Sequence, residues 1–125
     1  MTFRRLTFAL IVGTTFILPV AAHTKLVAAD PAADAITKAP AVLSLAFSEK
    51  IDSEFSGVEL RLLTMPGMQM DKPMPVSTTA AVGADGMSLL ITPRETLEAG
   101  TYSVTWNVVT SDTHRVEGTY SFTVE

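Results

Sequence analysis

The chain has no cysteine among its 125 residues. It therefore forms no disulfide and offers no thiolate for zinc, for iron–sulfur clusters or for nucleophilic catalysis. Stability must come from a hydrophobic core, and any metal must be held by His, Met, carboxylate or backbone nitrogen. Histidine is also scarce, because the sequence contains only His23 and His114.

The motifs that mark common catalytic sites are absent as well. The sequence contains no Gly-x-Ser-x-Gly, no P-loop, no dinucleotide-binding fingerprint and no His-Glu-x-x-His, and no nucleophile is paired with a base. Nor is there an excess of positive charge, since 9 basic residues face 13 acidic ones for a net charge of −4. We therefore expect a protein that is not an enzyme and that binds no nucleic acid.

One long apolar run, residues 6–20, follows two arginines near the start of the chain. It is short for a membrane span, which needs about 20 residues, and Val20-Ala21-Ala22 then supplies the small residues of a cleavage site. We expect residues 1–22 to be a secretory signal peptide, and an uncleaved membrane anchor is the alternative. Cleavage leaves one domain, residues 23–125, with 7 basic and 13 acidic residues. We expect this mature domain not to insert directly into a membrane.

Several segments of this domain alternate apolar and polar residues with a period of two, which is the pattern of half-buried strands. The clearest are residues 43–48, 58–62, 101–108 and 119–124, and weaker candidates are residues 25–28, 76–82 and 87–92. About seven short strands without an amphipathic helix predict an all-β fold, either an antiparallel β-sandwich or a Greek-key barrel. Four aromatic residues lie at alternate strand positions and are expected in the core: Tyr102, Trp106, Tyr120 and Phe122.

His23 becomes the first residue of the chain if cleavage follows Ala22. A terminal histidine offers two nitrogen donors, an α-amino group with a pKa near 8 and an imidazole, and tetragonal nitrogen and oxygen ligands suit Cu(II). Asp112 and His114 would project from the same side of an extended segment, about 6–7 Å apart at the backbone, so both could reach one ion. The alternative for this pair is an ordinary polar strand end with a surface histidine.

A second cluster consists of methionines in a segment rich in proline and glycine, residues 65–74. Its four methionines are Met65, Met68, Met70 and Met74. Core methionines belong in strands rather than in such a segment, and thioethers are soft ligands that select Cu(I). A flexible hydrophobic contact surface is the alternative.

Several short motifs occur in order over essentially the whole mature chain. Their combination is more specific than any one of them. They are His23-Thr24-Lys25-Leu26, Phe47-Ser48-Glu49, Phe55-Ser56-Gly57, Met65-Pro66-Gly67-Met68, Pro93-Arg94, Ala99-Gly100-Thr101-Tyr102, Trp106 and Ser111-Asp112-Thr113-His114. In this combination the sequence resembles the CopC/PcoC family of periplasmic copper-resistance proteins.

The resemblance implies a cupredoxin-like Greek-key β-barrel with a Cu(II) site near one end. The family's N-terminal histidine and Asp-x-His pair correspond to His23, Asp112 and His114, and its glutamate after Phe-Ser corresponds to Glu49. The family's Cu(I)-binding loop corresponds to the four methionines of residues 65–74. Members of the family carry a histidine in that loop, but this sequence has none, so an all-thioether site would depend less on pH.

Together these features predict a periplasmic copper carrier or buffer that contributes to copper resistance or homeostasis. It would exchange copper with a membrane or outer-membrane partner. One alternative is an oxidative polysaccharide-cleaving enzyme, because a terminal histidine and a second histidine also form the copper-binding brace of such enzymes. That brace needs an open coordination position, which Asp112 would occupy. The other alternative, a metal-free adhesive β-sandwich, leaves the methionines and His23 without a role.

Overall fold

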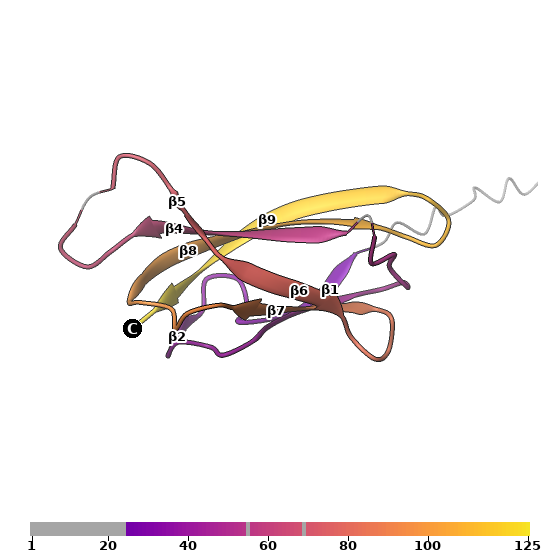
Figure 1. Ribbon diagram of the computed structural model, residues 1–125, viewed down its shortest axis with the longest axis horizontal. Helices are drawn as coiled ribbons and strands as arrows, with labels where there is room; N and C mark the ends of the chain where they lie inside the picture. Colours follow the sequence, from indigo (N-terminus) through magenta and orange to yellow (C-terminus); the bar gives the residue numbers. More distant parts are fainter. Residues whose placement is uncertain (1–24, 55, 69) are drawn as a thin grey trace, which may run out of the picture.

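A computed structural model describes residues 25–54, 56–68 and 70–125, which form a sandwich of two β-sheets (Figure 1). In strand order, the first sheet consists of β1 (Leu26–Asp30), β3 (Leu43–Phe47), β7 (Ser88–Pro93) and β6 (Thr78–Val82). The second consists of β2 (Ile36–Thr37), β9 (Arg115–Val124), β8 (Gly100–Val109), β4 (Gly57–Thr64) and β5 (Met74–Val76). Neighbouring strands are antiparallel except β2 and β9. No helix in this part of the chain is long and apolar enough to cross a membrane.

The core between the sheets is built from alternate strand positions. In β8 every second side chain is buried, as a strand with one face on the core requires. Trp106 meets Phe47 of the other sheet edge-to-face at 5.1 Å between ring centroids, and Tyr102 stacks on Phe122 of the neighbouring strand at 5.5 Å. The predicted burial of the aromatic residues is confirmed, except that Tyr120 is half-buried and packs at the edge of the core.

The predicted all-β sandwich is confirmed, but the described residues form nine strands rather than about seven. Residues 76–82, predicted as one strand, are divided at Ser77. The part before Ser77 pairs with β4 in one sheet, and the part after it pairs with β7 in the other. Pro75 has no N–H to donate, which confines β5 to the edge of its sheet. β2 has only two residues, too few for a periodic pattern to reveal.

The strand pairing places two connections at opposite ends of the sandwich. β8 and β9 form ten residue pairs and are joined by the turn at residues 110–114. β4 runs antiparallel to β8, and its last residue, Thr64, lies opposite Thr101 near the start of β8. The connection from β4 to β5, residues 65–73, therefore lies at the other end (Figure 1). At 3.2–3.4 Å per residue, the length of β8 separates these ends by about 30 Å.

Tyr102 fastens the connection that carries the chain from β7 to β8. Its hydroxyl donates a hydrogen bond of 2.7 Å to the carbonyl oxygen of Glu98, while its ring is buried. A buried tyrosine that bonds to the backbone a few residues upstream is the tyrosine corner of β-sandwiches. Burial, followed by the charge of Glu98, raises the pKa of Tyr102, so the hydroxyl stays a donor.

We expect Tyr102→Phe to lower the free energy of unfolding by about 1–2 kcal/mol, because the Glu98 carbonyl oxygen loses its donor. Urea denaturation measures this loss. Tyr120→Phe is the matched control, since the Tyr120 hydroxyl is buried without a hydrogen-bond partner in the described part of the chain. That variant should be unchanged or slightly more stable, and equal losses in the two variants would contradict a special role for the Tyr102 hydroxyl.

Candidate metal sites

The β8–β9 turn is closed by backbone hydrogen bonds. The N–H of Thr110 donates to the carbonyl oxygen of His114, and the N–H of Thr113 donates to the carbonyl oxygen of Thr110, both at 2.9 Å. Thr113 adopts a positive φ of 69°, a left-handed conformation in which the chain reverses direction. The prediction that Asp112 and His114 lie in an extended segment is therefore wrong, because strand pairing has already ended where they occur.

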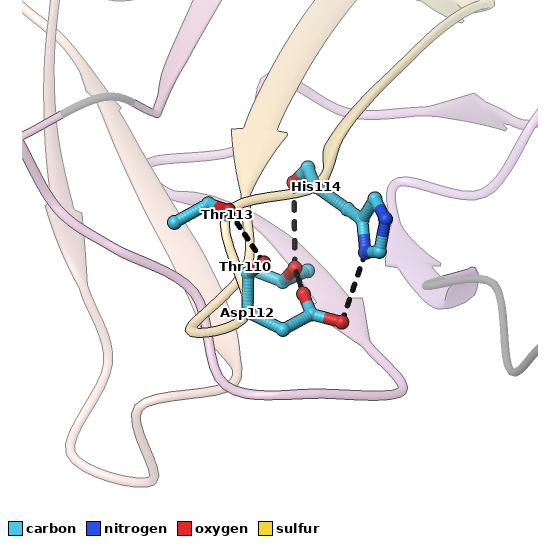
Figure 2. A network of polar contacts seen from close by, with 4 residues as sticks. All are labelled: Thr110, Asp112, Thr113 and His114. Carbon is cyan, nitrogen blue, oxygen red and sulfur yellow. Dashed lines mark hydrogen bonds and ion pairs between the residues drawn. The ribbon is translucent and has the colours of Figure 1, made fainter.

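The turn nevertheless brings the two predicted ligands into contact (Figure 2). Nδ1 of His114 lies 2.9 Å from Oδ2 of Asp112, and Oδ1 of Asp112 accepts a hydrogen bond from the Thr110 hydroxyl. The side chain of Asp112 is 56% exposed and that of His114 is 80% exposed. Figure 2 shows the second ring nitrogen of His114 pointing away from the carboxylate. An ion arriving from solvent can therefore reach this pair.

The contacts of Asp112 keep it ionised and determine which nitrogen of His114 is free. The Thr110 hydroxyl and then the His114 ring lower the pKa of Asp112 from 3.8 to about 2. A carboxylate only accepts hydrogen bonds, so Nδ1 of the neutral imidazole carries the ring proton in this contact. The lone pair of Nε2 is then available, as in metal-bound histidines whose other nitrogen donates to a carboxylate. The carboxylate also keeps lone pairs that neither contact uses.

The start of the described chain is fastened close to this turn. The N–H of Lys25 donates to Oγ of Ser48, and the N–H of Ser48 donates to the carbonyl oxygen of Lys25, both at 2.9 Å. Three residues after Ser48, Ile51 forms a β-bridge with Thr110, where the turn begins. His23 lies outside the described residues.

Asp112 and His114 form a pair rather than a complete site. Within residues 25–54, 56–68 and 70–125, no three His, Asp or Glu side chains are grouped closely enough to hold a metal ion. Glu49, which follows β3 in the sequence, is half-buried. It does not complete such a group. Within the described residues, this pair therefore supplies two of the predicted Cu(II) ligands and no third one.

The methionine-rich segment begins with a tight turn after β4. Met68 N–H donates to the carbonyl oxygen of Met65 at 3.1 Å, and Gly67 between them has a φ of 72°. Proline at the second position and a glycine with positive φ at the third are the features of a type II turn. Such a turn brings the α-carbons of Met65 and Met68 within about 7 Å of each other. Met74 begins β5, opposite Leu62 of β4.

The four thioethers of this segment differ in exposure. Met68 and Met74 are 59% and 53% exposed, whereas Met65 and Met70 are half-buried and pack against the core. The structure therefore gathers all four at one end of the sandwich, as two accessible sulfur donors and two that also contribute to packing. Met87, the first residue of the predicted strand at residues 87–92, lies just before β7 and is half-buried.

The sequence reasoning missed Thr110, the residue that holds the Asp112 carboxylate. A signal for it existed. Trp106 and Val108 are buried at alternate positions of β8, and position 110 is the next in this alternation. An apolar residue is expected there, but Thr110 carries a hydroxyl.

Comparisons with known proteins cover the same domain. The family model described as the CopC domain matches residues 26–125. The chain is 45% identical over 120 residues to copper resistance protein C of Escherichia coli, across 96% of this chain and 94% of that protein. It is 48% identical over 104 residues to copper resistance protein C of Xanthomonas campestris pv. juglandis, across 83% of this chain and 81% of that one.

A solved structure agrees with these sequence matches. The crystal structure of PcoC, a methionine-rich copper resistance protein from Escherichia coli, is similar with a TM-score of 0.76 and a sequence identity of 45%. The similarity covers 83% of this chain and 100% of that one. The family match over nearly all of the described chain and these identities show that the protein belongs to the CopC family.

Proposed function

We propose that this protein is a periplasmic copper carrier or buffer that contributes to copper resistance or homeostasis. The observation that carries the proposal is the Asp112–His114 pair, which leaves one imidazole nitrogen free at the end of the sandwich where Lys25 is fastened. The relatives named copper resistance protein C support the biological role. The charged start and apolar run of residues 1–22 support export through a cleaved signal peptide.

The proposed Cu(II) ligands come from both ends of the mature chain. They are the α-amino group and imidazole of His23, Nε2 of His114 and an oxygen of Asp112. Three nitrogens and one oxygen form the tetragonal set that Cu(II) prefers. Glu49 directly follows Ser48, which holds the N-terminal segment, and we include it as a further, more weakly bound oxygen ligand.

The proposed Cu(I) ligands are the thioethers of Met65, Met68, Met70 and Met74. Soft thioethers suit Cu(I) and need no deprotonation. Because β8 separates this segment from the β8–β9 turn by about 30 Å, the two sites cannot share one ion. A membrane or outer-membrane protein that exchanges copper would make contact at this end, where Met68 and Met74 are exposed.

A carrier fits the Cu(II) ligands better than an oxidative enzyme does. A copper centre that activates oxygen needs an open coordination position, and the Asp112 carboxylate, held beside His114, occupies one. The relatives are named for copper resistance, which is a binding role rather than a catalytic one.

Adding one glycine ahead of His23 in the mature protein converts the α-amino ligand into an amide. We expect Cu(II) affinity to fall by more than the 10- to 100-fold that is typical of changes in outer-shell residues, because a ligand itself is lost. Competition with a Cu(II) chelator measures the change, and mass spectrometry verifies the N-terminus. Cu(I) affinity is the internal control and should not change. Equal Cu(II) affinity in the extended protein would exclude the amine as a ligand.

The Cu(II) site should be sensitive to pH through its nitrogens rather than through its carboxylate. With its pKa lowered to about 2, Asp112 stays ionised at every pH used. Amines and imidazoles ordinarily titrate near pH 8 and pH 6.5, and bound copper must displace their protons. Affinity should therefore fall about tenfold per unit between pH 8 and 6.5, and by up to about a thousandfold per unit below that. Affinity that stays constant down to pH 4 would indicate a site made only of carboxylates.

Replacing Met65, Met68, Met70 and Met74 together by Leu should abolish Cu(I) binding while leaving Cu(II) affinity unchanged. Leucine roughly preserves volume and apolarity. Replacing the half-buried Met65 and Met70 should therefore lower the free energy of unfolding by less than about 1.5 kcal/mol each. Met87→Leu, outside the segment, is the matched control and should bind Cu(I) normally. Undiminished Cu(I) affinity in the fourfold variant, measured by competition with a Cu(I) chelator, would mean that the methionines form only a hydrophobic surface.

A further inference from the structure

We propose that Thr110 is a positioning residue for the Cu(II) site, and that its buried hydroxyl fixes the Asp112 carboxylate, which in turn fixes the ring of His114. The inference rests on the proposed Cu(II) function. Thr110 touches no metal in this account, so it acts through its neighbours.

The burial of Thr110 is the first observation that supports this role. Thr110 is 2% exposed, and among the described residues it is the one buried residue that is neither apolar nor aromatic in type. Burying a hydroxyl costs free energy unless it is hydrogen-bonded. Here the hydroxyl bonds to Oδ1 of Asp112 and lies 3.3 Å from the carbonyl oxygen of His114. A polar side chain at a strand position that otherwise carries apolar residues is typical of a functional position.

The second observation is that Thr110 joins a rigid part of the molecule to an exposed one. Ile51 forms a β-bridge with Thr110 itself. Val109, the residue before Thr110, forms hydrogen bonds through both its carbonyl oxygen and its N–H. Its carbonyl oxygen accepts from the N–H of Asp52 at 2.7 Å, and its N–H donates to Oγ of Ser56 at 3.1 Å. Asp112, by contrast, lies on an exposed turn.

Without the Thr110 hydroxyl, the Asp112 carboxylate keeps contacts only with His114, through its exposed ring and its backbone N–H, and both lie on the same turn as Asp112 (Figure 2). The pair would then sample other rotamers, and copper would have to order both side chains on binding. Outer-shell partners that orient metal ligands in this way typically contribute 10- to 100-fold to metal affinity.

The alternative is that the hydroxyl only stabilises the turn, and two substitutions separate the roles. Thr110→Val keeps the branched shape but removes the hydroxyl, whereas Thr110→Ser keeps the hydroxyl. We expect Thr110→Val to weaken Cu(II) binding by about 10- to 100-fold and Thr110→Ser to stay close to the parent. Cu(I) affinity should be unchanged in both. A Thr110→Val protein that melts at a lower temperature but binds Cu(II) as tightly as the parent would overturn the inference.

A double-mutant cycle with Asp112→Ala tests whether Thr110 acts through Asp112. If it does, Thr110→Val should produce no further loss of Cu(II) affinity once the carboxylate is gone. An equal loss with and without Asp112 would contradict the inference, and so would a loss that Thr110→Ser shares. A parent protein that binds no Cu(II) would instead refute the proposed function, so the two failures are distinguishable.

Discussion

The pairing of β8 with β9 is the interaction on which the rest of the structure depends. Ten residue pairs join these strands, and the inner face of β8 supplies much of the core. The pairing is close enough that position 118 must be glycine. A Cβ on Gly118 would lie 2.5 Å from the ring of Trp106, so the indole lies over the bare backbone of its partner strand. Packing of the only tryptophan therefore depends on the residue opposite it.

The same pairing determines where the chemistry lies. Where β8 and β9 meet, a five-residue turn puts a carboxylate and an imidazole in contact, and the segment containing Ser48 and Ile51 connects that turn to the start of the described chain. At the other end, β4 leads into the methionine-rich connection. Hard and nitrogen-rich ligands are thus kept apart from soft sulfur ligands by the length of one strand. Under the proposed function, this separation would let one small domain bind Cu(II) at one end and Cu(I) at the other.

The sequence predicted the parts of the fold that depend on periodicity. β3, β4, β8 and β9 bury alternate side chains, and their alternation was visible. β2 and β5 are too short to produce a pattern, and the change of sheet at Ser77 depends on long-range pairing that local sequence does not contain. At the candidate site, the spacing of Asp112 and His114 identified two side chains that the structure brings into contact, but the predicted reason was wrong. Their contact comes from a turn with positive φ at Thr113, not from an extended strand. The hydrogen bond from Thr110 to Asp112 could be found only in the structure, because a hydroxyl at the end of a strand can have many partners.

The central claim is that the mature N-terminus and the β8–β9 turn bind the same Cu(II) ion. Pulsed electron paramagnetic resonance of the Cu(II)-loaded mature protein tests it most directly, because it counts the imidazoles that bind the ion. We expect two imidazoles in the parent protein and one in a His114→Asn variant, in which the remaining signal comes from His23. A single imidazole in the parent protein, or a count that His114→Asn leaves unchanged, would contradict it.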